Sequence, residues 1–323
     1  MPAQKSHRKT RQKLGQHFLA QTSWRKRIAE TLGGTADAVW VEIGTGHGEM
    51  TELLAARTRR VIAIETDAAL IGPLRERAAH WLHGSRGSGG SGLSRVEIVH
   101  GDVLSLDLAA LVRSHPANDL RQGTVSTVPK SAITTGVLTP EAGLETGKPA
   151  HQVSSGERFR VYGNLPYYIT SPILSHLFRF ASQIDSIHIV TQLEVAERIA
   201  ARPRSRDYGY LSTLCQFYAQ PELVFRIPPG AFHPPPKVTS ALIAMRFPGE
   251  RAALGIRDES AFLKFLQLCF AHKRKTLRNN LRSVHPQDRI ERALGENALA
   301  DNSRAEELTL QQFARIFLSL NTE

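Results

Sequence analysis

A short apolar run that leads directly into a glycine-rich turn constrains the fold of this chain more than any other feature. Val39–Ile43 has the composition of a buried strand, the turn Gly44–Gly48 follows at once, and a helical pattern continues through Ala55. Glycines at alternate positions, Gly44 and Gly46, allow the backbone to approach a ligand closely at a helix N-terminus. The pattern predicts a strand, turn and helix unit with a ligand site at the turn.

Two later strands end in acidic residues, which narrows the class of ligand. The run Arg60–Ile64 ends in Glu65, where a carboxylate can accept both hydroxyl protons of a ribose. The run Val96–His100 leads to Asp102, which is placed to receive an adenine amine. The dinucleotide fingerprint requires a third glycine where this chain has Glu49, so the spacing favours S-adenosylmethionine over NAD.

The segment Asn164, Leu165, Pro166 and Tyr167 is suited to hold an exocyclic amine. The Asn164 side-chain oxygen offers one acceptor. A main-chain carbonyl at Leu165 or Pro166 offers another, because proline biases the preceding residue toward extended backbone. Tyr167 offers a flat face for an unstacked base. Such a tetrapeptide alone is more often a strand-ending turn, but with the two upstream strand ends it indicates chemistry at the N6 amine of adenine.

Strands alternate with helices as far as Val161, which predicts an α/β fold with a doubly wound parallel sheet. From Glu259 onward the pattern is helical. The remaining expected elements are a helix at Trp24–Leu32, a helix at about 171–180, a strand at Ser186–Val190, β-like runs at Glu222–Arg226 and Ser240–Met245, and an extended loop at Pro234–Pro236.

The charge balance suggests a polyanionic partner, because 41 Lys plus Arg face 30 Asp plus Glu and leave a formal net charge of +11. Many of the basic residues gather in three clusters along the chain. One basic cluster alone is usually a solvated surface or a tail, but the three together predict phosphate contacts without identifying the nucleic acid. The clusters are Lys5, Arg8, Lys9, Arg11 and Lys13; Arg198, Arg202, Arg204 and Arg206; and Lys273, Arg274, Lys275, Arg278 and Arg282.

Several classes of protein are not favoured by the composition. Cys215 and Cys269 are the only cysteines, the histidines have no zinc-like spacing, and no apolar run is long enough to span a bilayer. We therefore expect a cytosolic protein with reduced thiols, no metal and no membrane segment.

Further motifs give the chain a resemblance to the ribosomal RNA adenine dimethyltransferase family, in its bacterial small-subunit branch. The resemblance covers nearly the whole sequence. In addition to the elements above, it is carried by Gly15–Leu19, Glu194–Arg198, Tyr208–Gly209 with Leu211–Ser212, Ala231–Val238, Lys273–Asn279 and Arg304–Glu306.

The resemblance implies a Rossmann-like S-adenosylmethionine-dependent methyltransferase with a small C-terminal helical domain. Its implied substrate is a pair of adjacent adenines in a hairpin loop near the 3′ end of small-subunit (16S) ribosomal RNA, dimethylated at N6 within an immature 30S particle by a monomeric enzyme. The implied cofactor site comprises His17, Leu19, Gly44, Gly46, Glu65, Asp102 and Asn164. The catalytic group is Asn164, Leu165, Pro166 and Tyr167 with Phe232 as a second stacking face, and the RNA contacts are Lys273, Arg274, Lys275, Arg278, Arg202 and Arg204.

The expected domains are a basic flexible arm at residues 1–14, the methyltransferase domain at 15–248 and a helical RNA-contacting domain at 249–323. Residues 84–92 have a flexible-linker composition, and a stretch of about 113–157 has no aromatic residue and is expected to be a disordered insertion.

Three other functions compete with this interpretation. A large-subunit ribosomal RNA dimethylase of the macrolide-resistance type would share the catalytic residues. A DNA adenine methyltransferase would more typically carry Pro-Pro-Tyr after its Asp or Asn. A mainly non-catalytic RNA-binding assembly or transcription factor would have less need of Glu65, Asp102 and Asn164 together.

Overall fold

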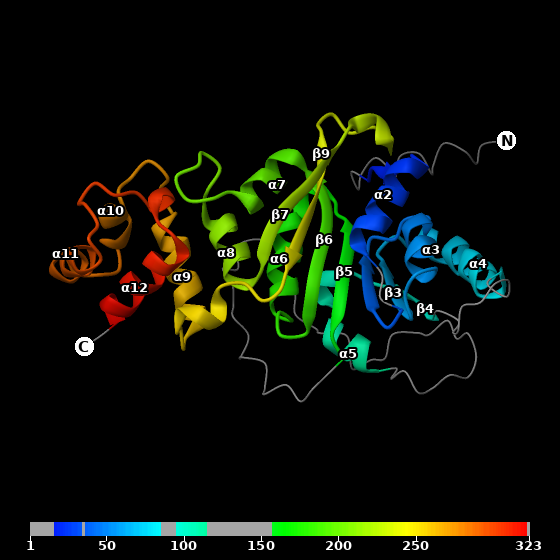
Figure 1. The fold of residues 1–323 in the computed structure, drawn as a ribbon, viewed down its shortest axis with the longest axis horizontal. Coiled ribbons are helices and arrows are strands. Elements are labelled where there is room, and N and C mark those ends of the chain that lie inside the picture. Colours follow the sequence, from blue (N-terminus) through cyan, green and yellow to red (C-terminus); the bar gives the residue numbers. More distant parts are fainter. Residues whose placement is uncertain (1–15, 34–35, 85–94, 115–156, 322–323) are drawn as a thin grey trace. The chain divides into compact units, whose positions relative to one another are not determined.

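The computed structural model describes residues 16–33, 36–84, 95–114 and 157–321 (Figure 1). These residues belong to two compact units. The first comprises the chain up to Leu193 together with Val224–Ala244, and the second comprises Glu194–Leu223 together with the chain from Met245 onward. The expected arm at 1–14, and nearly all of the expected linker and insertion, lie outside the described residues.

A seven-stranded sheet in the order β4-β3-β2-β5-β6-β9-β7 organises the first unit. The pairs β2–β3, β2–β5, β3–β4 and β5–β6 are parallel, as expected, and β9 and β7 extend them into a mixed sheet. Every residue of β2 is buried, as is typical of a parallel strand covered on both faces. The strands are β2 Val39–Ile43, β3 Arg60–Glu65, β4 Arg95–His100, β5 Phe159–Asn164, β6 Ile184–Gln192, β7 Gln220–Ile227 and β9 Ser240–Arg246.

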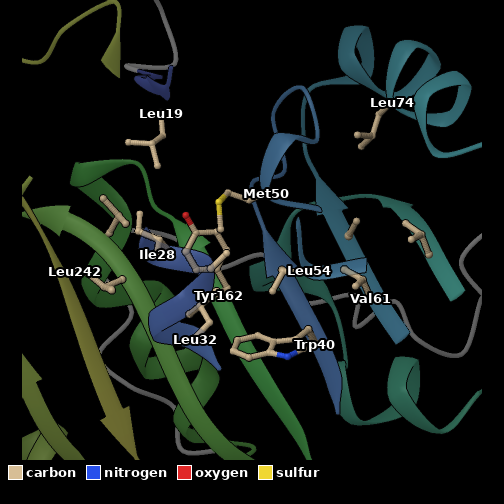
Figure 2. Close-up of a cluster of buried hydrophobic side chains, with 14 of the residues drawn as sticks. Leu19, Ile28, Leu32, Trp40, Met50, Leu54, Val61, Leu74, Tyr162 and Leu242 are labelled. Atoms are coloured by element: carbon tan, nitrogen blue, oxygen red, sulfur yellow. The ribbon is translucent and has the colours of Figure 1, made fainter. Parts of the chain in front are cut away.

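Helices connect the parallel strands, and an apolar cluster packs α2, α3 and α4 against the sheet. Figure 2 shows Trp40, Leu54 and Tyr162 within this cluster, all of them at most 2% exposed. The helix α6 ends before the expected residue 180, because the Phe180 amide bonds to the Leu177 carbonyl in a tighter turn. The helical elements are α2 Thr22–Leu32, α3 Glu49–Ala55, α4 Ala68–Gly84, η1 Val103–Ser105, α5 Leu108–Arg113, η3 Tyr167–Ile169, α6 Thr170–Phe178 and η4 Pro229–Ala231.

A second, two-stranded sheet fixes the segment 16–21, which we call the N-terminal strap. Its strand β1 Phe18–Leu19 pairs antiparallel with β8 Phe232–His233. The amides that follow, of Ala20 and Gln21, both donate to the Ala231 carbonyl at 2.8 and 3.1 Å. The strap is therefore held by backbone hydrogen bonds to a loop more than two hundred residues away in sequence.

The second unit is helical around an aromatic core. Phe262 contacts Phe217, Phe265 and Phe317 with ring centroids 5.3–6.3 Å apart. Because α8 contributes Phe217, residues 194–223 group with the C-terminal helices, which differs from the expected domain boundary at 249. No helix in the described part of the chain has the length and apolar character needed to cross a membrane. The elements are α7 Leu193–Ala200, α8 Tyr210–Tyr218, η5 Arg251–Leu254, α9 Glu259–Cys269, α10 Leu277–Leu281, α11 Gln287–Glu296, η6 Ala305–Glu307 and α12 Leu310–Asn321.

Candidate active site

A pocket of about 740 Å³, counted with its solvent-open mouth, lies at the carboxyl ends of the parallel strands of the first unit. Parallel strands deliver their carboxyl ends to one edge of the sheet, which is where open α/β sheets bind ligands. Gly44 follows β2, Glu65 ends β3, Asp102 follows β4 and Asn164 ends β5, and all four line the pocket. Gln16, His17 and Phe18 of the strap complete the wall together with Pro166 and Tyr167.

Backbone conformation favours glycine at two positions of the turn, and packing requires it at one of them. Gly46 has a φ of +58°, and a Cβ at this position would lie 2.9 Å from two ring carbons of Phe18. Gly44 has a φ of +72° and lines the pocket, so a side chain there would be strained and would intrude on a ligand. Both positions therefore favour glycine, while the close approach of a ligand to this backbone stays a prediction.

Glu65 is a structural element of the turn as well as a wall of the pocket. Its side chain is 2% exposed. Oε2 accepts the Gly46 amide at 2.8 Å, and Oε1 accepts the amides of Thr66 and Asp67 at 2.9 Å. Three main-chain donors thereby fix the carboxylate at the β3 end and leave acceptor capacity on Oε2 for a hydroxyl group of a ligand.

Asp102 lies at the neighbouring strand end and is exposed toward the pocket. Its Oδ1 caps η1 by accepting the Leu104 amide at 3.0 Å. The Gly101 amide donates to the Glu65 carbonyl at 3.0 Å and so ties the two strand ends together. The two carboxylates line the pocket together with the apolar side chains of Ile64 and Val103.

The side-chain amide of Asn164 is oriented by the strap. Its Nδ2 donates to the His17 carbonyl at 2.8 Å. A carbonyl only accepts, so the nitrogen must face His17 and Oδ1 is the atom available to accept from a ligand. That Oδ1 accepts from an amine stays a prediction.

The two carbonyls expected as the second acceptor, those of Leu165 and Pro166, lie in different surroundings. The Pro166 carbonyl accepts the Ile169 amide at 3.2 Å. Leu165 is 2% exposed, and its amide donates to the Val190 carbonyl on β6 at 3.1 Å. Leu165 therefore anchors the turn in the core, and both residues line the pocket, so either carbonyl can be the second acceptor for a ligand N–H.

The ring of Tyr167 is held at its hydroxyl and at one face. The hydroxyl shares a hydrogen bond of 2.8 Å with the Ser240 hydroxyl. The His17 ring stacks on Tyr167, with centroids 5.7 Å apart and planes 25° from parallel. Burial raises the pKa of the Tyr167 phenol, and the Ser240 hydrogen bond opposes part of the shift. The neighbouring Tyr168, by contrast, is 68% exposed.

Two expected site residues lie in the core rather than on the pocket wall. Leu19 and Phe232 are register partners in β1 and β8, are 8% and 3% exposed, and belong to the apolar cluster. Within the described residues, the ring found against Tyr167 is that of His17 and not that of Phe232. Neither the His17 ring contact nor the Ser240 hydrogen bond has a signal in sequence spacing, because both join segments far apart in the chain.

The expected RNA-contacting residues lie in the second unit and differ in their hydrogen bonds and charged neighbours. Lys273 Nζ donates to the Arg206 carbonyl at 2.8 Å, which joins two basic clusters that are separate in sequence. The Arg204 amide donates to the Glu306 carbonyl at 2.7 Å, and Arg204 has a φ of 70°. The side chains of Arg202, Arg204, Lys273, Arg274 and Lys275 are exposed.

Arg278 differs from these residues because its guanidinium faces two carboxylates. Its Nη1 lies 3.6 Å from Glu291 Oε1 and 3.5 Å from Asp301 Oδ2, and the side chain is 28% exposed. Its charge is therefore partly balanced within the unit.

Comparison with known proteins assigns the family. The family model described as ribosomal RNA adenine dimethylase matches residues 7–322. The protein named ribosomal RNA small subunit methyltransferase A of Koribacter versatilis is 38% identical over 99% of this chain and 98% of its own length. The protein of the same name from Acidobacterium capsulatum is also 38% identical, over 97% of this chain and 92% of its own.

Solved structures agree with the expected fold class. The crystal structure of the 23S rRNA methyltransferase ErmE is 25% identical, has a TM-score of 0.58 and covers 94% of this chain and 100% of its own. A dimethyladenosine transferase from Plasmodium falciparum, 18% identical with a TM-score of 0.63, covers 94% of this chain and 98% of its own and supports the fold alone. The α/β methyltransferase fold predicted from the sequence is confirmed, and the chain belongs to the ribosomal RNA adenine dimethylase family.

Proposed function

We propose that the protein dimethylates N6 of two adjacent adenines in a hairpin loop near the 3′ end of small-subunit (16S) ribosomal RNA. It acts in the cytoplasm, as a monomer, on an immature 30S particle, and its cofactor is S-adenosylmethionine. The observation that carries the proposal is the Asn164 amide, which the His17 carbonyl orients at 2.8 Å with its oxygen available to an amine. This acceptor lies in one pocket with the Glu65 and Asp102 carboxylates.

The cofactor would be held by the strand ends and the strap. Glu65 receives the ribose hydroxyls, Asp102 receives the adenine amine, and the backbone at Gly44 and Gly46 leaves room for the amino-acid portion. His17 brings the strap against the same ligand, and Leu19 holds the strap from the core. When bound, S-adenosylmethionine supplies an electrophilic methyl group on a sulfonium.

The target adenine would be held by the segment that follows β5. Asn164 Oδ1 and the carbonyl of Leu165 or Pro166 accept the two N–H groups of N6, and this favours the pyramidal geometry in which the nitrogen lone pair attacks. Pro166 fixes the backbone between these acceptors and Tyr167, which stacks on the ring. Phe232 supports this region from the core. An alkylated N6 is acidic, so its proton leaves to an acceptor or water without a strong base, and the remaining N–H permits the second transfer.

Small-subunit RNA is favoured over large-subunit RNA by the relatives. Proteins 38% identical to this chain carry the name small subunit methyltransferase, whereas the large-subunit methyltransferase ErmE is 25% identical. The proposed RNA contacts are the exposed Arg202, Arg204, Arg274 and Lys275, with Lys273 supporting the loop at Arg206 and Arg278 a weaker contributor because of its acidic neighbours.

The test is to incubate the protein and labelled S-adenosylmethionine separately with immature small subunits, mature large subunits and double-stranded DNA, and then to map the label. We expect dimethyladenosine at two adjacent positions near the 3′ end of the small-subunit RNA. Label in large-subunit RNA or DNA would contradict the proposed substrate. Binding of small subunits without any label would favour the assembly-factor alternative.

A further inference from the structure

The side chain of His17 makes its contacts on the target-amine side of the pocket. Its Nδ1 lies 2.8 Å from the Pro234 carbonyl, and its ring stacks on Tyr167 with centroids 5.7 Å apart. Its own carbonyl accepts the Asn164 amide at 2.8 Å. Both Asn164 and Tyr167 are therefore in direct contact with one residue of the strap.

We infer that His17 is a positioning residue for the target adenine, acting through Tyr167, in addition to any contact that it makes with the cofactor. This inference rests on the proposed function. Its ring stacks on Tyr167, with planes 25° from parallel, and so restrains the ring on which the base is proposed to stack. With Ser240 at the hydroxyl and His17 at the face, the ring has two independent restraints, and removing one lets it turn about the other.

The position of the His17 ring is itself fixed. The Pro234 carbonyl can only accept, so His17 Nδ1 carries the proton that joins them. The strap backbone that follows His17 is held by pairing of Phe18 and Leu19 with β8. The amides of Ala20 and Gln21 hold it further by donating to the Ala231 carbonyl. A restrained ring against Tyr167 pre-organises the stacking face before RNA arrives, which is how supporting residues raise the rate of a positioned reaction.

A double-mutant cycle separates this role from a purely cofactor-binding role. Single-turnover methylation of immature small subunits is measured at saturating S-adenosylmethionine for the wild type, His17→Ala, Tyr167→Ala and the double variant. We expect His17→Ala alone to lower the rate about 5- to 30-fold, and to cost less than about 2-fold when Tyr167 is already alanine. Equal losses in both backgrounds, or a loss confined to the KM for the cofactor, would overturn the inference.

Two further variants test the chemistry of the contact. His17→Phe keeps a ring against Tyr167 but cannot donate to Pro234, so it should recover part of the rate that His17→Ala loses. His47→Ala is the matched control, because the His47 ring contacts the strap through Phe18, with centroids 4.7 Å apart, and not through Tyr167. Its effect should simply add to that of Tyr167→Ala. Coupling of His47 to Tyr167 as strong as that of His17 would reduce the role of His17 to general support of the strap and would overturn the inference.

A measurement without RNA keeps the inference distinct from the proposed function. The Tyr167 ring resonances, assigned by their loss in Tyr167→Phe, should shift in His17→Ala and stay in place in His47→Ala, because a stacked neighbour shields ring protons. If the wild type fails to methylate small subunits, the proposed function falls while this measurement still decides the contact. Unchanged Tyr167 resonances in His17→Ala would overturn the inference whatever the activity.

Discussion

At the scale of single residues, the site is an arrangement of acceptors whose directions are set by backbone groups. Asn164 is turned by the His17 carbonyl, and Glu65 is fixed by three amides. Such groups need no reorganisation when a ligand arrives, which is the condition under which they contribute most to a rate.

Asn164 and Tyr167 should separate chemistry from binding. Asn164→Ala should lower the single-turnover rate by about 10²–10³ at saturating cofactor, because one preorganised acceptor is removed. Subunit affinity should barely change, since phosphate contacts dominate it. Tyr167→Ala should cost about 1–3 kcal/mol in positioning the base, while Tyr167→Phe keeps the aromatic face and most of the activity. Near-normal turnover in Asn164→Ala would leave the proposed mechanism without its central residue.

Glu65 should affect both cofactor binding and the turn. Glu65→Ala should weaken S-adenosylmethionine binding by about 1.5–3 kcal/mol, because a buried charged acceptor is removed. It should also lower the melting temperature of the ligand-free protein, because the Gly46, Thr66 and Asp67 amides lose their acceptor. Calorimetry measures the first effect and thermal unfolding the second. Unchanged cofactor affinity would argue against the ribose assignment.

Glu42 should make stability fall as the pH rises. It is 1% exposed on β2, opposite Tyr162 on β5. Burial raises its pKa from 4.5 to about 8, the nearby Glu65 and Glu49 add to the shift, and the Thr51 hydroxyl opposes it. The folded protein therefore holds a proton that the unfolded chain releases. As the pH rises from the lower to the higher of these two pKa values, the free energy of unfolding should decrease, by at most a few kcal/mol.

The isosteric variant Glu42→Gln tests this argument, because an amide does not titrate. Urea unfolding at pH 5 and pH 8.5 should show a smaller loss of stability for Glu42→Gln than for the wild type. An equal loss in the two proteins would mean that Glu42 is not the group responsible.

At the scale of elements, the strands β2, β3, β4 and β5 were predictable because each joins an apolar run to a chemically distinctive end. The expected strand Val39–Ile43 has the bounds of β2, and Arg60–Ile64 falls one residue short of β3. The strap was not predictable, because β1 and β8 have two residues each and a strand that short has no periodicity to detect. For the same reason the partners of Asn164 and Tyr167 could be found only in the fold, while the residues themselves could be found in the sequence.

The basic residues of the second unit should contribute unequally to small-subunit binding, according to the groups that surround each of them. Arg274→Ala with Lys275→Ala should weaken small-subunit binding and lower its salt slope by about 1 for each phosphate that is no longer neutralised, with cofactor affinity unchanged. Lys273→Ala should weaken binding as well, because the loop at Arg206 loses its anchor. Arg278→Ala is the comparison, since its charge faces Glu291 and Asp301. A larger drop in salt slope for Arg278→Ala than for the Arg274 and Lys275 pair would reverse the assignment.

At the scale of the whole molecule, hydrogen bonds within the first unit hold the chain on either side of the expected insertion. Arg60 donates to the carbonyls of Leu111 and Val112 at the end of α5, and the Phe159 amide at the start of β5 donates to Gln183 at 2.9 Å. Replacing residues 116–155 by a short flexible linker should therefore leave the unfolding free energy within about 1 kcal/mol and methylation largely intact. Loss of the folded circular dichroism signal would show that the segment belongs to the domain.

The path of the chain between the two units also limits which segments homologues can exchange by recombination. The chain enters the second unit after Leu193, returns at Val224 inside β7, and leaves again after Ala244 inside β9. A chimera joined only at residue 249 would combine Phe217 from one parent with Phe262 and Phe317 from the other. The aromatic core would then be a hybrid, so recombination between homologues preserves this unit only when α7 and α8 are inherited together with the C-terminal helices.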